Sequence, residues 1–359
     1  MDELTDLTAD LVSVPSHEDE TAAGDAIESW LRAETDAAVE RDDVGNVIAR
    51  KGTGGTSLAL VGHHDVVPPD EGQVDDDGYV VRTEDGRLYG RGAADMKGAV
   101  AAAMVAFRDA DPTGELVFAS FVGEEVGGTG ARHAIEEGFT PDCAVVGEGS
   151  TNYSGPDVTD VAVAHRGRRG STLLASGAAS HASEPEAGVN AVYRACDAVD
   201  VVRELETPRT TVLGHEIGGS LVVTEIEGGS AGNVVPARCE VTIDERTVPG
   251  ERADLSRVEH EVEGIEWRVD RDVPPMACDD PAFADAVLDA AREAQEAVPE
   301  QVTKPHATDA GRLAEAGTTC VICGPSEPGE AHTKDESVSI EVLERCYRIY
   351  RGVAESYGE

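Results

Sequence analysis

The spacing of apolar residues in the first half of the chain alternates between a helical and a strand-like pattern. Apolar residues recur at helical intervals in three segments, near residues 18–33, 97–109 and 129–137. Continuous apolar runs typical of buried strands lie near residues 57–62, 115–122 and 142–147. This alternation predicts an α/β fold with a largely parallel sheet. Because ligands gather at the carboxyl ends of strands in such sheets, the residues that follow each strand are the first candidates for a functional site.

The pattern changes between residues 165 and 272. Strand-like runs lie near 171–175, 220–226, 239–247 and 264–270, and helical segments near 188–204 and 252–262. We interpret this part as a self-contained α+β unit of the sandwich type. After Pro274 and Pro275 the helix–strand–helix pattern resumes. The simplest architecture is therefore a discontinuous α/β domain, residues 1–164 and 273–359, interrupted by a smaller inserted domain, residues 165–272.

Acidic residues dominate the charge of the protein. The sequence has 71 Asp and Glu against 29 Lys and Arg, a formal net charge of -42, and the excess is spread along the chain. Such a field excludes nucleic acid and anionic membrane as partners. It favours a halophilic protein, whose charges are screened within a few ångström by a high-salt cytoplasm, over an ordinary acidic one. The content of 40% hydrophobic residues, many in continuous runs, indicates a packed core rather than disorder.

The termini and the cysteines indicate a cytoplasmic protein. The sequence begins without a basic segment followed by an apolar stretch, and it has no run of about 18 apolar residues. Its seven cysteines are therefore not expected to form a disulfide framework. Cys320 and Cys323 form a C-x-x-C pair inside an apolar run. We interpret them as core residues of a strand, because no second pair completes a zinc site.

Histidine and carboxylate residues follow the predicted strands and are bounded by glycine. They are His63, Asp65, Asp95, Glu124, Glu125, Glu148 and His332. Mixed nitrogen and oxygen ligands suit zinc, cobalt or manganese, and two neighbouring ions would need one bridging carboxylate. An aspartate two residues after a histidine can hold its second ring nitrogen. In so acidic a chain, however, any one carboxylate is by default a surface charge, and spacing alone leaves both interpretations open.

Five motifs narrow this choice. They are Gly-His-x-Asp-Val-Val-Pro at 62–68, Gly-Arg-Gly-x-x-Asp-Met-Lys-Gly at 90–98, Glu124–Glu125, Gly147–Glu148 and Ala331–His332. In this order they resemble the co-catalytic zinc peptidases and deacylases, a family that includes carboxypeptidase G, acetylornithine deacetylase and succinyl-diaminopimelate desuccinylase. The resemblance spans nearly the whole chain. It implies a zinc-peptidase-like catalytic domain and an inserted lid and dimerisation domain, and hence a homodimer.

The resemblance also implies roles for the residues of the predicted metal site. Asp95 would bridge two divalent ions, zinc in the first place and cobalt or manganese as alternatives. The other ligands would be His63 and Glu148 for one ion, and Glu125 and His332 for the second. Asp65 would orient His63, and Glu124 would be the general base and acid. His64 matches no ligand position and is interpreted as structural; the bond between Asp95 and Met96 is expected to be cis.

Further positions resemble the family's substrate-binding residues. His181 matches the histidine that polarises the scissile carbonyl, in some members from the partner subunit, although Ser180 stands where glycine commonly precedes it. The expected substrate contacts are Arg168, Ser171, Asn233, Arg246 and Thr308. The alternative for Arg246 is an ion pair with Asp244, and for Arg168 a surface charge.

The expected function is hydrolysis of the amide bond of a small N-acyl amino acid. N-succinyl-diaminopimelate, a substrate of lysine biosynthesis, is the first expectation, because its several carboxylates would use two arginines. The alternatives are deacetylation of acetylornithine in arginine biosynthesis, which the ending at residues 324–336 resembles, and a carboxypeptidase or dipeptidase activity. A non-catalytic acidic metal-binding protein is the alternative from another class; the presence of every ligand and of Glu124 argues against it.

Overall fold

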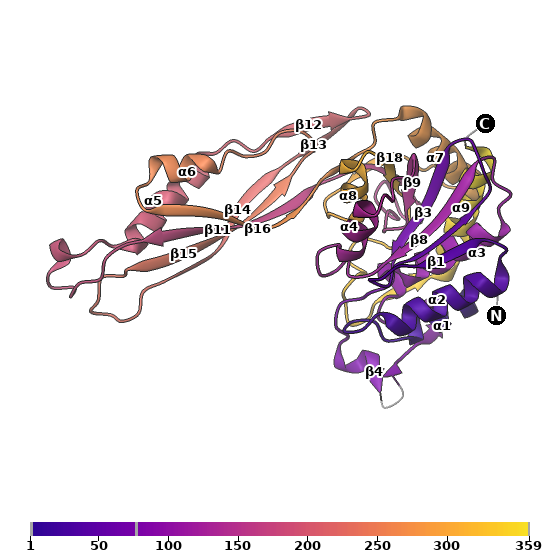
Figure 1. Ribbon diagram of the computed structural model, residues 1–359, viewed down its shortest axis with the longest axis horizontal. Coiled ribbons are helices and arrows are strands. Elements are labelled where there is room, and N and C mark those ends of the chain that lie inside the picture. The colour runs from indigo at the N-terminus through magenta and orange to yellow at the C-terminus, as the bar shows by residue number, and fades with distance from the viewer. Residues whose placement is uncertain (1–2, 76–77, 358–359) are drawn as a thin grey trace. The chain divides into compact units, whose positions relative to one another are not determined.

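The computed structural model describes residues 3–75 and 78–357 and divides into two compact units. The first, which we call the α/β unit, contains the chain up to Ala164, Met276–Lys304 and Thr308–Glu359. The second, the inserted unit, contains His165–Pro275 and Pro305–Ala307. Figure 1 shows the helices and strands of each unit.

A nine-stranded mixed sheet forms the centre of the α/β unit. Its order is β1 (Ala38–Arg41), β2 (Val47–Lys51), β8 (Glu115–Phe121), β3 (Ser57–His63), β9 (Cys143–Val146), β19 (Thr319–Ile322), β10 (Val161–His165) and β17 (Met276–Ala277), with β18 (Gln301–Lys304) paired to β10. The four strands β8, β3, β9 and β19 are parallel to one another. The pairs β1–β2, β2–β8 and β10–β19 are antiparallel. The expected parallel arrangement thus applies to the centre of the sheet, where the strands are buried on both faces.

Helices cover both faces of this sheet. One face carries α1 (Glu3–Ser13), α2 (Thr21–Glu34), α3 (Gly98–Asp109), α7 (Pro281–Ala294) and α9 (Ile340–Ser356), and the other carries α4 (Thr129–Glu136) and α8 (Asp309–Glu315). Helix α3 is buried along almost its whole length, because alanines let it approach the strands closely. Side-chain oxygens cap the N-termini of three of these helices: Asp280 caps α7, Thr308 caps α8 and Ser339 caps α9.

Two small sheets complete the α/β unit. Strands β6 (Arg82–Glu84), β7 (Arg87–Tyr89) and β20 (Ser337–Ser339) form one, and β4 (Val74–Asp75) and β5 (Gly78–Tyr79) form the other. The pairing of β20 with β7 joins the segment after His332 to the segment before Asp95, which are far apart in the sequence. This pairing places two predicted ligand loops next to each other.

The inserted unit is a four-stranded antiparallel sheet with helices on one face. The strand order is β14 (Ser220–Gly228), β15 (Arg238–Thr247), β11 (Gly167–Ser176) and β16 (Ile265–Val273). Helices α5 (Ala191–Glu204) and α6 (Ser256–Glu261) pack on the face that carries Leu173, Val241 and Ile243. The sheet also carries exposed apolar side chains: Val222 lies on the opposite face, whereas Ile226 and Val269 lie towards the ends of the helix-covered face. Strands β12 (Arg209–Val212) and β13 (His215–Gly218) form a separate hairpin.

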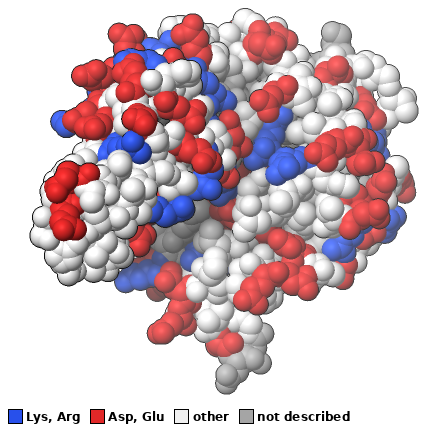
Figure 2. All heavy atoms as spheres, turned by 60° about the vertical axis from the view of Figure 1, so that its left-hand side comes forward, with Lys and Arg blue, Asp and Glu red and all other residues white. Residues whose placement is uncertain are grey.

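The two units differ in the type of basic residue that they carry. Acidic side chains are spread over the face seen in Figure 2, with basic ones between them. The four lysines all belong to the α/β unit: Lys97 and Lys304 are buried, Lys51 is half-buried, and Lys334 is exposed. All basic residues of the inserted unit other than histidine are therefore arginines.

The remaining features concern membrane and cysteine chemistry. In the parts of the chain that the structure describes, no helix is both long and apolar enough to span a membrane. All seven cysteines are free. Cys320 lies in β19 and Cys323 directly after it, and both are completely buried, as expected for core residues.

Candidate metal centre

The five predicted ligands lie together at the carboxyl ends of the central strands. His63 is the last residue of β3, Glu125 follows β8, and Glu148 follows β9. Asp95 lies in the turn Ala93–Lys97 that precedes α3, and His332 lies in the loop between β19 and β20. Parallel strands end at the same edge of the sheet, which is why residues so distant in sequence meet.

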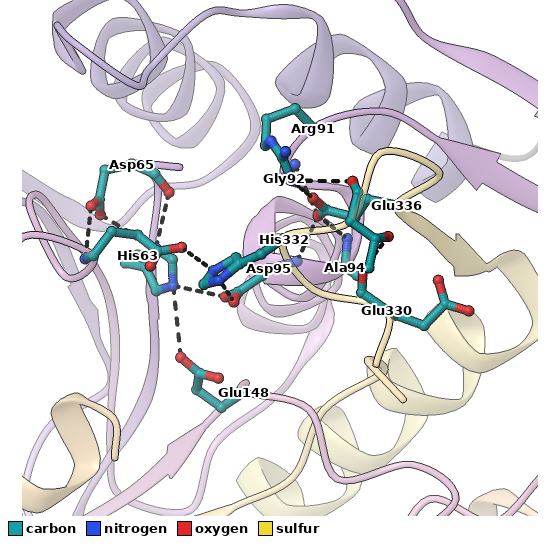
Figure 3. A network of polar contacts seen from close by, with 12 residues as sticks. His63, Asp65, Arg91, Gly92, Ala94, Asp95, Glu148, Glu330, His332 and Glu336 are labelled. Atoms are coloured by element: carbon teal, nitrogen blue, oxygen red, sulfur yellow. Dashed lines mark hydrogen bonds and ion pairs between the residues drawn. The ribbon is translucent and has the colours of Figure 1, made fainter. Parts of the chain in front are cut away.

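The ligands form two groups that share Asp95. In the first group His63 Nε2 lies 3.1 Å from Asp95 Oδ1 and 3.7 Å from Glu148 Oε1. In the second, His332 Nε2 lies 3.2 Å from Asp95 Oδ2 and 2.8 Å from Glu125 Oε1. The ligand atoms of each group all lie within 4.8 Å of one another. Each group therefore uses a different oxygen of Asp95 (Figure 3). The Asp95–Met96 peptide bond is cis, as the resemblance implied.

The electrostatic field at these groups favours cations. Hydrogen bonds that the carboxylates of Asp95 and Glu125 accept from the ring raise the pKa of His332 to about 10. Burial alone would lower the pKa of His63, but its contacts with Asp65, Asp95 and Glu148 raise it well above its ordinary value. Carboxylates that attract protons to two imidazoles in this way also attract divalent cations, for which the imidazoles would be neutral ligands. The donor set fits two divalent ions that accept nitrogen and oxygen ligands.

Asp65 connects the first group to the Glu124–Glu125 segment. Its Oδ1 lies 3.3 Å from His63 Nδ1, and its main-chain oxygen lies 3.0 Å from the same nitrogen. The two carboxylate oxygens also accept the backbone N–H groups of Glu124 and Glu125, each at 3.0 Å. Asp65 thus fixes the ring of His63 and the start of the segment with one side chain.

Glu124 is a carboxyl group whose surroundings favour its protonated form. Burial and the charges of Asp309 and Glu148 raise its pKa well above its ordinary value. Glu124 is not a member of either ligand group. The Oε1 of its neighbour Glu125 lies 2.8 Å from His332 Nε2, within the second ligand group. This arrangement suits a general base beside the ligands rather than a further ligand.

His64, next to the ligand His63, is a buried structural residue. It is completely buried, and its Nδ1 lies 2.9 Å from the hydroxyl oxygen of Ser120. Burial lowers the pKa of His64 to about 3, which keeps the ring neutral. The interpretation of His64 as structural agrees with these contacts.

Glu336 supports the centre, and the sequence interpretation missed this role. Its Oε1 accepts three backbone N–H groups, from Gly92 at 3.0 Å, Ala94 at 3.0 Å and Asp95 at 3.1 Å. Its Oε2 accepts a hydrogen bond from Arg91 Nη1 at 2.6 Å, and both side chains are buried (Figure 3). One carboxylate therefore anchors the Asp95 turn to the segment that follows His332. In the sequence Glu336 appears only as one acid of the C-terminal motif, and nothing in the apolar pattern distinguishes it.

The predicted substrate residues of the inserted unit are more exposed. Arg168 on β11 and Arg246 on β15 lie directly opposite each other. Asp244 accepts a hydrogen bond from the Nε of each arginine, both at 2.7 Å. Arg246 thus makes the ion pair with Asp244 that was its alternative interpretation, and Arg168 shares it. About half of the Arg168 side chain and a third of the Arg246 side chain stay exposed. Ser171 lies on the opposite, helix-covered face, where its hydroxyl is buried.

The other three predicted contacts have different surroundings. His181 and Asn233 are exposed, and their segments lie side by side through a bridge between His181 and Val234. The Nδ1 of His181 lies 2.6 Å from the hydroxyl oxygen of Ser183. Thr308 is buried in the α/β unit, where its hydroxyl accepts the backbone N–H of Ala310 at the start of α8.

A central mixed α/β sheet, an inserted α+β unit and paired histidine–carboxylate groups at the strand ends define a metal-dependent hydrolase. The chain belongs to the peptidase family M20/M25/M40, whose model matches residues 59–356. It is a hydrolase of the metallopeptidase and deacylase class.

Individual relatives agree with this membership. The chain is 32% identical to an acetylornithine deacetylase from Myxococcus xanthus over 343 residues, which cover 90% of this chain and 86% of that protein. The fold is similar to that of the aminopeptidase PepT from Bacillus cereus, with a TM-score of 0.81, 20% identity and coverage of 98% and 97% of the two chains. A dinuclear metal-binding peptidase of the same family, the YXEP protein of Bacillus subtilis, gives a TM-score of 0.72 at 16% identity, covering 98% and 96%.

Proposed function

We propose that the protein hydrolyses the amide bond of a small N-acyl amino acid at a centre of two divalent ions, zinc in the first place. The observation that carries this proposal is the pair of ligand groups that share Asp95 through separate oxygens. Such a shared carboxylate suits two ions a few ångström apart. The ligands would be His63, Asp95 and Glu148 for one ion and Asp95, Glu125 and His332 for the other.

The protein's own groups would carry the proton transfers. The bound ions supply Lewis acidity, which lowers the pKa of water and polarises the acyl carbonyl. Glu124 accepts a proton from the attacking water and returns it to the leaving amine, a use consistent with its raised pKa. Asp65 holds the backbone of Glu124 and the ring of His63, so base and ligand keep a fixed relation. His181 is proposed to stabilise the oxyanion, from its own or a partner subunit.

The arginine pair of the inserted unit supports an acyl group that carries its own carboxylate. Arg168 and Arg246 are held on one face by Asp244, and each keeps part of its guanidinium exposed. A guanidinium binds a carboxylate through two parallel hydrogen bonds. We therefore propose N-succinyl-diaminopimelate as the first substrate, with Asn233 and Thr308 as further contacts. The buried hydroxyl of Ser171 leaves that residue outside this surface.

Acetylornithine is the second candidate substrate. It is favoured by the 32% identity to an acetylornithine deacetylase, which extends over most of both proteins. Its single carboxylate would use one arginine of the pair.

Assembly and location belong to the same proposal. A homodimer through the inserted unit is supported by its exposed apolar side chains, Val222 and Ile226 on the edge strand β14. A cytoplasmic location is consistent with seven free cysteines.

A single experiment tests the activity and its substrate. Purified protein in molar potassium chloride would be assayed for kcat/KM with N-succinyl-diaminopimelate and N-acetylornithine, before and after removal of metal by a chelator. We expect chelator-sensitive hydrolysis, restored by zinc or cobalt, with the succinyl substrate preferred. A clear preference for the acetyl compound would assign the protein to acetylornithine. Metal binding without hydrolysis of either compound or of dipeptides would instead support a non-catalytic metal-binding protein.

A further inference from the structure

Lys304 is a buried cation beside the candidate metal centre. It is the last residue of β18, and only 5% of it is exposed. Its Nζ donates a hydrogen bond to Glu148 Oε2 at 3.1 Å. The other oxygen, Oε1, lies 3.7 Å from His63 Nε2 and belongs to the first ligand group. The two oxygens of Glu148 therefore have different partners.

The ammonium of Lys304 is charged in these surroundings. Its Nζ lies 3.1 Å from an oxygen of the Glu148 carboxylate, and both side chains are largely buried, so the opposite charges stabilise each other. The contact is thus a charge-assisted hydrogen bond between two poorly hydrated groups. The other buried lysine, Lys97, donates instead to a main-chain oxygen, that of Val14.

This ion pair limits what Glu148 can offer to a metal ion. A carboxylate can bind an ion with one oxygen or with both. If Oε2 turned towards an ion, the ammonium would lose its partner in a site that water hardly reaches, and an unpaired buried charge is costly. As long as the pair persists, Oε1 is the oxygen that remains for the ion.

We propose that Lys304 is a positioning residue that restricts Glu148 to one ligand oxygen. The inference rests on the proposed metal centre and goes beyond it, because it assigns a role to a residue outside the ligand set. An additional carboxylate oxygen on the ion would occupy a position that water or the substrate carbonyl needs. Lys304 thereby preserves an open coordination position, which separates catalytic from structural metal sites.

The test compares Lys304→Met, which removes the charge, with Lys304→Arg, which keeps it. Lys51→Met is the matched control, because Lys51 bonds the main-chain oxygens of Arg108 and Ala110. Each protein would be loaded with cobalt(II), whose visible absorption weakens as its coordination number rises. We expect Lys304→Met to retain both ions, to lose roughly half of the absorption and to show the spectral form of higher coordination. Its kcat should fall at least about tenfold while KM changes less than about threefold.

The conservative variant and the control sharpen this result. Lys304→Arg should restore most of the absorption and of kcat, and Lys51→Met should match the wild type. An unchanged spectrum and kcat in folded Lys304→Met would overturn the proposal, and so would the loss of one ion, which would mean that Lys304 holds Glu148 in place as a whole.

Two further outcomes remain decisive. Should Lys304→Met not fold, Lys304→Gln offers a neutral donor to Oε2; we expect the same spectral change at smaller size, and an unchanged spectrum would contradict the proposal. A wild-type protein that binds no cobalt would instead overturn the metal centre itself, which distinguishes the two failures.

Discussion

The two units differ in how firmly they hold their candidate functional residues. In the α/β unit, His63 and Asp65 are 2% and 3% exposed, and further buried side chains fix the ligands. Asp65, Lys304 and Glu336 each bond a ligand or its backbone. In the inserted unit, His181 and Asn233 are exposed, and the arginine pair depends on the single carboxylate of Asp244.

Under the proposed function, this difference would separate the residues of the chemistry from those of substrate recognition. Ligands and a base must keep their geometry to within a fraction of an ångström, and a network of buried hydrogen bonds provides that precision. Side chains that select a substrate must first meet it from water, so they remain accessible. We expect substitutions in the α/β unit to change kcat and those in the inserted unit to change substrate preference.

The largest effect is expected for Glu124→Ala. Because base and proton donor are lost together, kcat should fall by about 10²–10⁴-fold while both ions remain bound. Metal content and initial rates, measured on the same preparation, check this. Glu136→Ala, in the exposed part of α4, is the control and should match the wild type. Full activity of Glu124→Ala would assign the base to another residue.

Glu336→Gln should have the next largest effect. The amide keeps one acceptor for the Asp95 turn, but it loses the charge that bonds Arg91. Loss of a supporting partner costs about 10–100-fold in metal affinity or activity. Metal titration and thermal melting of the metal-free protein would show weaker binding and a lower Tm. Glu330→Gln removes a nearby carboxylate that bonds Arg87 and should leave metal affinity unchanged; equal losses in both variants would refute a specific anchor.

A smaller effect is expected in the inserted unit from Arg168→Ala. Loss of a charge-assisted contact should lower kcat/KM for the succinyl substrate by about tenfold and leave the acetyl substrate unchanged. Arg203→Ala, an exposed arginine of α5, is the control. Equal decreases for both substrates would show that Arg168 does not recognise the acyl carboxylate.

The net charge of -42 predicts that stability rises with salt, by a few degrees in Tm. Self-repulsion should be screened as the Debye length falls from about 10 Å at 0.1 M to a few ångström at 2 M potassium chloride. Calorimetry across this range checks the expectation. An unchanged or falling Tm would exclude the halophilic interpretation.

The smallest effect concerns Asp309, a buried carboxyl at the start of α8. Burial raises the pKa of Asp309 from 3.8 to about 7 in the folded protein. Between these two pKa values the folded state keeps a proton that the unfolded state has released. The free energy of unfolding therefore decreases as pH rises from about 4 to about 7. Asp309→Asn does not titrate, so its Tm advantage over the wild type should grow through this window. Both proteins would be melted free of metal in molar salt. A Tm difference between variant and wild type that stays constant across this pH range would contradict the expectation.

The comparison also shows what the sequence could reveal. His63, Glu125 and Glu148 became candidates because apolar runs mark the strands and these residues lie at or shortly after the strand ends, and the motifs then favoured them as ligands. Asp95 and His332 lie in a turn and a loop, where their glycine-bounded placement made them candidates and the motifs favoured them as ligands. The antiparallel outer strands could not be predicted, because apolar periodicity does not encode strand direction.

The roles of the residues that support the ligands could not be predicted from the sequence, for a related reason. Lys304 and Glu336 are ordinary charged residues in loops or at strand ends, and their roles depend on partners more than 150 residues away along the chain. Ser171 was expected to contact substrate, but strand register places its side chain on the face opposite to Arg168. A one-residue step along a strand reverses the face, which a motif does not show.

Because of where the lysines lie, one lysine side chain is exposed to amine-directed reagents. Lys97 and Lys304 are buried, Lys51 bonds two main-chain oxygens, and the inserted unit has no lysine. An amine-directed fluorophore should therefore attach preferentially to the exposed Lys334, two residues from His332. A dye at that position would sense the filling of the second ligand group as a change in emission, and so provide an optical readout of metal loading without an engineered label site.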